Sequence, residues 1–353
     1  MQKTKLFSKI PTIRDIAKEA NVSIATVSRA ISGKEGVGPD TREKILGIIK
    51  RFKYFPNLQA RGLVSRHLES IGIIIPRTAE YVFSNPFYSE VLKGISAVAR
   101  KLRYYLLFSF ADDNSYSQMY HNRLAAGIIV ITNRIDDPKV EDLIKNQIPL
   151  VLIPGDPKRN NIPSVNIDNI TGAFEAITYL INLGHRRIGF LSGSKNSRFS
   201  IERLLGFREA MEHNHLPIKE EFILETDFVL EKAYESMKNL ISMENPPTGV
   251  FVVNDYCALG ALKAAKEKKL KVPQDISIVG FGDIPIASMT DPPLTTIHEP
   301  FQEMGGEAVE MLLKIINKKR LPKKEITLSV YLNIRETAAP PKIYTKDDFK
   351  ILA

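Results

Sequence analysis

The residues best suited to contact a nucleic acid lie near the N-terminus. Arg29 is long enough to donate hydrogen bonds to a guanine edge or to a phosphate. Ile24 and Ala25 can touch a thymine methyl group, although they could instead pack within a helical hairpin. Hydroxyl groups and helix N-terminal amides can contact phosphates, although two of these hydroxyls could serve only as helix caps. The hydroxyl side chains in question are Thr12, Ser23, Thr26 and Ser28.

Two short helices joined by a tight turn would position these side chains. In the segment TIRDIAKEANVSIATVSRAI (12–31), apolar residues recur at i, i+3, i+4 and i+7, which is the pattern of an amphipathic helix. Thr12 and Asp15 have the spacing of a capping box, Asn21 can adopt the left-handed conformation that ends a helix, and Ser23 can cap the second helix. Pro39 then precedes a third apolar stripe, Ile45, Ile48, Ile49 and Phe52, which predicts a three-helix core.

The net positive charge of the chain comes from this region. Residues 1–66 contain 14 Lys and Arg against 5 Asp and Glu, a net of +9, which equals the net charge of all 353 residues. A basic helical module beside a neutral remainder is typical of a protein that binds a polyanion. A membrane surface is a weaker interpretation, because no long apolar segment or lipidation signal accompanies the charge.

Other chemistries have little support in the sequence. No P-loop, G-x-S-x-G, His-Glu-x-x-His or paired-Cys pattern occurs, so we predict no enzyme activity, catalytic residue, metal site or cofactor. The single cysteine, Cys257, excludes an intrachain disulfide. The first residues lack the apolar core of a secretory signal, so we expect a cytoplasmic protein.

After Ser70 the pattern changes to short apolar runs that alternate with helical stretches. This rhythm predicts parallel sheets built from βα units, and it occurs twice, which implies two lobes facing each other across a cleft. The predicted strands of the first series are 71–75, 104–110, 127–131 and 149–153, and those of the second are 186–193, 221–228, 248–255 and 275–283. A helix in 301–319 and one strand in 325–334 are expected to cross back between the lobes.

The N-terminal run resembles the LacI/GalR family of bacterial transcriptional repressors. The segments that carry the resemblance are TIRDIAKEANVSIATVSRAISGK, VGPDTREKI and FKYFPNLQARGL, followed along the core by DNITGA, LGHRRIGFLSG, VVNDYCALGAL, VPQDISIVGFGD and PPLTTIHEP. The resemblance implies that a hinge helix starting near Asn57 folds on the operator with Arg61, and that Leu63 wedges into the minor groove. The segment 111–126 is shorter than the family usually has. An extension before Asn85-Pro86-Phe87 is similar to regulators of maltose and other α-glucosides.

The resemblance also indicates where an effector would bind. Ligands of such lobes bind beyond the carboxyl ends of the strands, and the family's ligand contacts correspond to residues that follow the apolar runs. Aromatic rings with Asp, Asn and Arg suit a sugar, whose CH faces stack on rings while its hydroxyls need polar partners. The predicted effector contacts are Phe87, Tyr88, Arg203, Phe228, Asn254 and Asp283.

We therefore expect an N-terminal all-α helix-turn-helix domain plus an α/β two-lobed core with parallel sheets, similar to periplasmic binding proteins. The expected divisions are a DNA-binding domain (1–56), a hinge helix and linker (57–68), a two-lobed core (69–340) and a C-terminal tail (341–353). The first lobe covers about 69–168 with a return after 300, and the second covers about 169–299.

The predicted function is that of a homodimeric, sugar-responsive repressor that binds a near-palindromic DNA operator and no membrane. The alternatives are a sugar-binding transport protein and a sugar-modifying enzyme with an added DNA-binding module.

Overall fold

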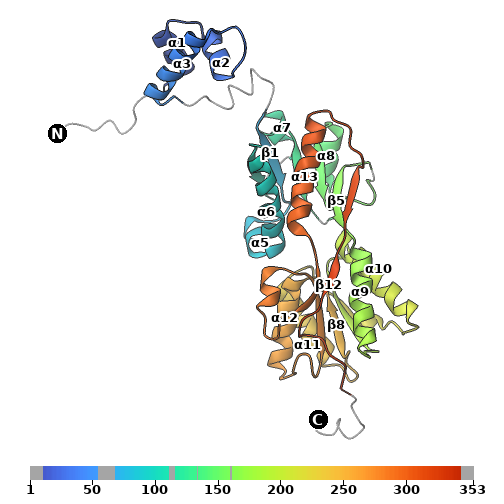
Figure 1. The fold of residues 1–353 in the computed structure, drawn as a ribbon. Coiled ribbons are helices and arrows are strands. Elements are labelled where there is room, and N and C mark those ends of the chain that lie inside the picture. Colours follow the sequence, from blue (N-terminus) through green and yellow to red (C-terminus); the bar gives the residue numbers. More distant parts are fainter. Residues whose placement is uncertain (1–10, 55–67, 111–115, 133, 160, 343–353) are drawn as a thin grey trace, which may run out of the picture. The chain divides into compact units, whose positions relative to one another are not determined.

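The computed structural model describes residues 11–54, 68–110, 116–132, 134–159 and 161–342. The chain forms two compact units, residues 1–68 and 69–353 (Figure 1). No helix in these described ranges is long and apolar enough to cross a membrane.

In the first unit, the described residues 11–54 form three helices: α1 (Ile13–Ala20), α2 (Ile24–Ile31) and α3 (Pro39–Phe52). The predicted caps are confirmed. Thr12 and Asp15 form a capping box, Asn21 ends α1 at a φ of 55°, and Ser23 caps α2. Each helix contributes one completely buried aliphatic side chain to the small core, and these are Ile16, Val27 and Ile45.

The second unit contains two six-stranded sheets, each forming one lobe (Figure 1). The first sheet is parallel throughout, in the order β11-β5-β4-β3-β1-β2. Its strands are β1 (Ser70–Ile74), β2 (Tyr105–Ser109), β3 (Ile128–Ile131), β4 (Leu150–Ile153), β5 (Ser164–Ile167) and β11 (Glu325–Leu328).

Helices cover both faces of this sheet, which is why its central strands are apolar at every position. Successive strand residues point to opposite faces, so Ile73 and Ile129 pack in one core cluster while Ile74 and Ile128 pack in another. The helices of this lobe are α5 (Ala79–Ser84), α6 (Pro86–Lys101), α7 (Gln118–His121), α8 (Pro138–Lys145) and α13 (Phe301–Ile316). The short segment before β3 carries only the four-residue helix α7 among its described residues.

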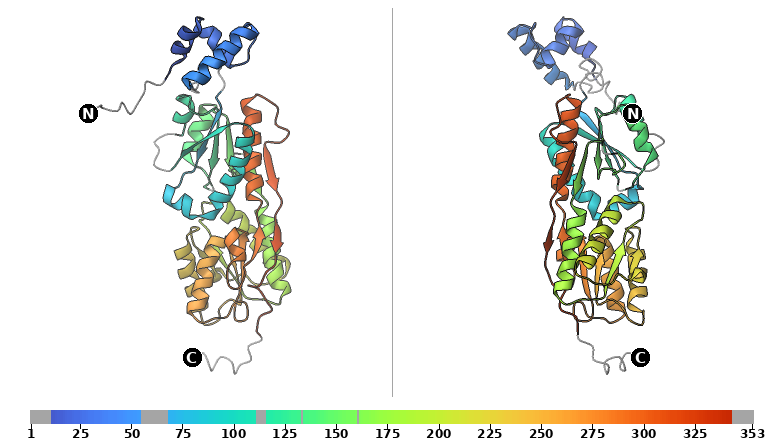
Figure 2. Two further views of the ribbon diagram at one scale, coloured as in Figure 1. Left: turned by 60° about the vertical axis from the view of Figure 1, so that its left-hand side comes forward. Right: turned by 90° about the vertical axis from the view of Figure 1, so that its right-hand side faces the viewer.

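The second sheet has the order β12-β10-β9-β8-β6-β7 and is parallel except for β12, which is antiparallel to β10. Its strands are β6 (Ile188–Ser192), β7 (Ile223–Glu225), β8 (Gly249–Val252), β9 (Ser277–Gly282), β10 (Thr295–His298) and β12 (Tyr331–Asn333). Its helices are α9 (Asn169–Asn182), α10 (Arg198–His213), α11 (Leu230–Ile241) and α12 (Asp255–Glu267), with short 3₁₀ turns at Glu220–Phe222 and Pro285–Ser288. Within this lobe α9 packs on α10, and α11 packs on α12 (Figure 2).

The chain passes between the lobes at three places: from β5 to α9, from β10 to α13, and from β11 to β12. The last passage corrects one prediction. Residues 325–334 were expected to form one strand, whereas β11 ends at Leu328 in the first sheet and β12 begins at Tyr331 in the second. Strands β5 and β10 were also missed, because each is a four-residue segment with polar residues among its apolar ones.

Candidate functional site

Helix α2 presents an outer face of small and apolar side chains with one cation. Ile24 is 44% exposed, and Ala25 and Arg29 are also exposed, whereas Val27 and Ala30 on the opposite face are buried. This division arises because residues three and four apart share a helix face, so the inner stripe packs on α1 and α3. An outer face of this kind can approach the floor of a major groove.

The hydroxyl groups near this face already have partners within the chain. The Oγ of Ser23 accepts a hydrogen bond from the Thr26 N–H at 3.1 Å and lies 2.9 Å from the Thr26 hydroxyl. The Thr12 hydroxyl donates to the Asp15 carboxylate at 2.7 Å. The Thr12 and Ser23 side chains therefore serve as caps in the free protein, and the Thr26 hydroxyl is paired with Ser23, while Ser28 is half-buried on α2. The predicted hinge contacts Asn57, Arg61 and Leu63 lie outside the described residues.

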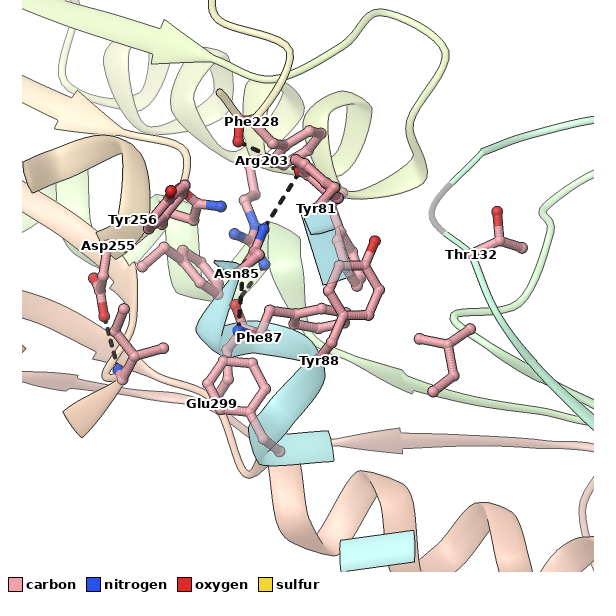
Figure 3. A pocket seen from close by; sticks show the side chains of 16 residues that line it. Tyr81, Asn85, Phe87, Tyr88, Thr132, Arg203, Phe228, Asp255, Tyr256 and Glu299 are labelled. Atoms are coloured by element: carbon pink, nitrogen blue, oxygen red, sulfur yellow. Dashed lines mark hydrogen bonds and ion pairs between the residues drawn. The ribbon is translucent and has the colours of Figure 1, made fainter. Parts of the chain in front are cut away.

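A cavity of about 40 Å³ lies between the two lobes of the second unit (Figure 3). Among the described residues, eight aromatic residues line it, together with an equal number of polar and aliphatic ones. The aromatic residues are Tyr81, Phe87, Tyr88, Phe199, Phe228, Tyr256, Phe281 and Phe301. The volume accommodates a few water molecules and is far below the several hundred Å³ of a typical ligand pocket.

Aromatic contacts fill the cleft from both sides. The Phe87 ring, from α6 in the first lobe, makes edge-to-face contacts with Phe199 of α10 in the second lobe and with Phe301 at the start of α13, at centroid distances of 6.0 and 5.6 Å. The Tyr81 hydroxyl also donates to the Phe228 carbonyl across the cleft at 3.4 Å. A ligand of sugar size therefore requires these rings to separate.

Arg203 is the central cation of the site and is only 1% exposed. Its Nη2 donates to Glu299 Oε1 at 2.7 Å, its Nε donates to Asn169 Oδ1 at 2.8 Å, and its Nη1 donates to the Val253 carbonyl. The guanidinium also lies 3.6 Å above the centroid of the Phe281 ring. Since α10 belongs to the second lobe and Glu299 to the passage toward the first, Arg203 joins the lobe to its hinge.

Of the six predicted effector contacts, five line this cavity: Phe87, Tyr88, Arg203, Phe228 and Asn254. Asn254 also caps α12, because its Oδ1 accepts from the Cys257 N–H at 2.8 Å.

Asp283 does not line the cavity, so the structure does not bring it together with the other five. Its carboxylate accepts hydrogen bonds from Asn333 Nδ2 at 3.1 Å and from Arg335, and it lies 2.9 Å from His298 Nδ1. Burial raises the pKa of Asp283, but the hydrogen bonds from Arg335, His298 and Asn333 outweigh it and hold this pKa below its usual value. Asp283 thus ties β9 to β12 at the hinge.

Two buried carboxyl groups of the cavity wall were not predicted as effector contacts. Asp255 is 1% exposed and Glu299 is 3% exposed. Asp255 comes next after Asn254 beyond the end of β8, so the strand-end rule that identified Asn254 could also have identified it. Glu299 follows β10, and because that strand was missed, no sequence signal pointed to it.

Burial controls the ionisation of this cluster. It raises the pKa of Asp255 to about 7, even though the Thr296 hydroxyl and the Ile284 N–H donate to the carboxylate and favour its charged form. Burial likewise raises the pKa of Glu299, against the opposing effect of Arg203, and lowers the pKa of Arg203. The site thus contains two carboxyl groups and one cation in a cavity with little room for water.

Comparison with known families matches two segments of the chain. Residues 12–57 match the family of bacterial regulatory proteins named after lacI, and residues 177–338 match a periplasmic binding protein-like domain.

Named relatives match over nearly the whole chain. Catabolite control protein A of Priestia megaterium is 34% identical over 332 residues, covering 92% of this chain and 98% of that protein. The transcriptional repressor CytR of Escherichia coli K12 is 32% identical over 317 residues, covering 88% of this chain and 91% of that protein.

Solved structures agree with these relatives. The Lac repressor dimer bound to operator and the anti-inducer ONPF superposes with a TM-score of 0.83 at 27% identity, covering 94% of this chain and all of that one. The regulator CelR in complex with cellobiose superposes with a TM-score of 0.70 at 27% identity, covering 93% of this chain and all of that one.

Proposed function

Because this chain belongs to the LacI family of bacterial regulatory proteins, we propose that a small molecule in the cleft between its lobes controls its affinity for an operator. The chain is a DNA-binding transcription regulator. Its operator, its effector and the residues that contact them are the subject of the proposal.

The observation that carries the DNA-binding part is the outer face of α2 together with the local charge. Ile24, Ala25 and Arg29 are exposed, and residues 1–66 hold the whole positive excess of the chain. Arg29 supplies the base or phosphate contact, and Ser23, Thr26 and Thr12 exchange their present hydrogen bonds for phosphate contacts. Asn57, Arg61 and Leu63 add a minor-groove contact that bends the duplex.

The protein acts as a homodimer on a near-palindromic site in the cytoplasm, where the DNA of a bacterium lies. A two-fold symmetric dimer places two α2 helices in successive major grooves, so each half-site repeats the other in inverted orientation. Solved relatives include a repressor dimer bound to operator, which supports this arrangement.

The effector is a sugar, and the regulated genes serve carbohydrate uptake or use. Relatives have been solved with cellobiose and with ribose, and the aromatic and polar lining of the cavity suits such ligands. The sugar separates the rings of the cleft and stabilises one arrangement of the lobes. Its differential affinity for the two arrangements then shifts the population that binds DNA.

Selection of duplexes from a random-sequence library, followed by binding measurements on the enriched sequence, tests the DNA-binding part. We expect an inverted repeat and an affinity that falls with a linear log–log dependence on salt concentration. Enrichment of no sequence, or binding that ignores salt, would contradict it.

A thermal-shift panel of mono- and disaccharides on the full chain tests the effector part. A sugar that binds only the folded protein stabilises it by about 2.7 kcal/mol at a hundredfold excess over its Kd. The same sugar must then change operator affinity. A sugar that stabilises the protein without changing operator affinity would contradict the proposed coupling.

A further inference from the structure

The cavity wall contains one more negative than positive charge when its carboxyl groups are ionised. Arg203 is the cation, and Asp255 and Glu299 are the two carboxylates. Arg203 binds only Oε1 of Glu299, and the buried Oε2 has no hydrogen-bond partner among the described residues. Asp255 accepts hydrogen bonds from two neutral donors, the Thr296 hydroxyl and the Ile284 N–H. A buried charge without a counter-charge is costly, so this site favours a further cation.

The neighbouring charged groups do not supply that cation. Arg335 and His298 are paired with Asp283 at the hinge. Arg77 lies over the Tyr81 ring, 5.5 Å from its centroid, and does not line the cavity. Glu202, on the same helix as Arg203, is paired with Arg198 at 2.7 Å. Among the described residues of the cavity wall, Arg203 is the one cationic side chain.

The aromatic lining favours the same kind of ligand. The faces of aromatic rings carry partial negative charge and attract ammonium groups, most strongly where water is excluded. Arg203 already uses two of these rings, since its guanidinium lies 3.6 Å from the centroid of Phe281 and 5.1 Å from that of Phe199. Phe87, Tyr81 and Tyr88 of the first lobe also line the cavity (Figure 3), as does Phe301.

We propose that the effector carries a protonated amine that donates a hydrogen bond to Glu299 Oε2 and balances the excess negative charge of the cavity. The inference rests on the proposed function, because it assumes that a small molecule occupies the cleft. Within that function it narrows the effector to an amino sugar or a similar polar aliphatic amine. Glu299 then determines specificity. When this carboxyl group is ionised, its free oxygen accepts a hydrogen bond and cannot donate one.

A proton takes the place of the amine when the cleft is empty. Burial holds the pKa of Asp255 at about 7, so this carboxyl is half protonated near neutral pH. An arriving ammonium group favours the ionised carboxyl and expels that proton. The affinity for the amine therefore rises by about tenfold per pH unit below pH 7, levels off above it, and falls again once the pH exceeds the pKa of the ligand's own amine.

Matched pairs that differ only in replacing an amine by a hydroxyl test the proposal on the full chain. Ethanolamine and ethylene glycol form a pair near the size of the present cavity, and D-glucosamine and D-glucose form a pair of sugar size. Thermal shift at constant chloride and calorimetry in buffers of different ionisation enthalpy are the measurements. We expect the amine of at least one pair to bind at least tenfold more tightly than its partner, with release of a proton.

Two variants and a control assign the effect to residues. In Asp255→Asn, the amide oxygen can accept from Ile284 N–H and the amide nitrogen can donate to Thr296, so the hydrogen bonds survive while the charge is lost. In Glu299→Gln, the amide oxygen can still accept from Arg203, and a donor replaces the free acceptor. Both should remove the preference for the amine and the proton release. Glu235→Gln, on the exposed face of α11, should change neither.

The pH series on the unaltered chain decides the matter even if a variant fails to fold. Equal or tighter binding of the hydroxyl compounds, or amine binding without proton release, overturns the inference. If neither compound of either pair binds, the inference is overturned as well. If a neutral sugar outside these pairs binds and changes operator affinity, the proposed function stands while this inference falls. If no small molecule binds, the effector part of the proposed function also fails.

Discussion

At the scale of single residues, Arg203 illustrates how one side chain joins the cavity to the stability of the lobe. Replacing it by methionine leaves the Glu299 carboxylate buried without its cation, and breaking such a pair costs about 3–5 kcal/mol. We expect chemical denaturation, followed by circular dichroism because the chain lacks tryptophan, to show a loss of this order. The double variant Arg203→Met/Glu299→Met should recover part of the loss. A double variant no more stable than the single one would argue against a buried ion pair.

The raised pKa of Asp255 has a consequence for stability that is separate from ligand binding. The unfolded carboxyl releases its proton near 3.8, whereas the folded one keeps it up to about 7. Unfolding therefore releases a proton in this window, and stability falls as the pH rises from about 4 to 7, by at most about 4 kcal/mol. Asp283 acts oppositely, because its lowered pKa contributes stability that is lost at lower pH. Asp255→Asn should flatten the decline between pH 4 and 7; parallel curves for the two proteins would contradict the assignment.

Arg29 is the residue of the helical unit whose removal should weaken DNA binding most clearly. Arg29→Ala should reduce operator affinity by about 1–3 kcal/mol, because a contact to a guanine edge or phosphate disappears from the exposed face of α2. Fluorescence anisotropy with the selected operator measures the change. Lys263→Ala removes an exposed cation of the second unit and serves as the control. Equal losses in the two variants would show only a general charge effect.

At the scale of elements, the contact between α6 and α13 depends on two glycines. A Cβ on Gly94 would lie 1.9 Å from the Gln302 carbonyl oxygen, and one on Gly305 would lie 2.2 Å from the Val91 carbonyl oxygen. Gly94→Ala and Gly305→Ala should each destabilise the first lobe by about 1–3 kcal/mol, since the helices must move apart.

The neighbouring glycine provides the control for these two variants. A Cβ on Gly306 meets only the Val98 side chain at 3.1 Å, and alanine favours the helix by about 1 kcal/mol, so the effects of Gly306→Ala should nearly cancel. Thermal denaturation followed by circular dichroism compares the three variants. An equal gain in stability in all three would show that helix propensity rather than close packing governs this contact.

Sequence patterns predicted the elements whose environment is uniform. The central strands are buried on both faces and appear as continuous apolar runs, and the three helices of the first unit carry regular stripes and caps. Strands β5 and β10 escaped because buried polar side chains, Asn166 and Thr295 among them, interrupt their apolar pattern. The break between β11 and β12 was not predicted, because the two strands differ in the sheet to which each belongs and not in their residue types.

The cavity was predictable to the same limited extent. Strand ends indicated Asn254 and Phe228, and the family resemblance indicated these together with Phe87, Tyr88 and Arg203, all of which line the cavity. Asp283 lies at the end of a strand as well, but three partners from the hinge and β12 hold its carboxylate elsewhere. Glu299 could not be found, because its role depends on the passage between lobes, which is a property of tertiary structure.

At the scale of the whole molecule, the proposed DNA binding belongs to one compact unit, residues 1–68, and the proposed effector binding to the other, residues 69–353. A protein lacking residues 1–68 should lose operator binding and keep the effector-dependent thermal shift, because the cavity is built entirely from residues 81–301. Operator binding that survives the deletion would place the DNA contact in the lobes instead. The full chain measured in parallel is the control.

The three passages between the lobes also govern the order in which the protein can fold during synthesis. The first sheet needs β11, the second needs β12, and helix α13 covers a face of the first sheet, yet all three lie after residue 300. Neither lobe is complete while the ribosome is still translating the first 300 codons, and on the nascent chain the apolar face that includes Ile73 and Ile129 lacks its cover by α13. A message truncated near its end therefore yields two unfinished lobes rather than one finished lobe, and such products are substrates for chaperones and proteases.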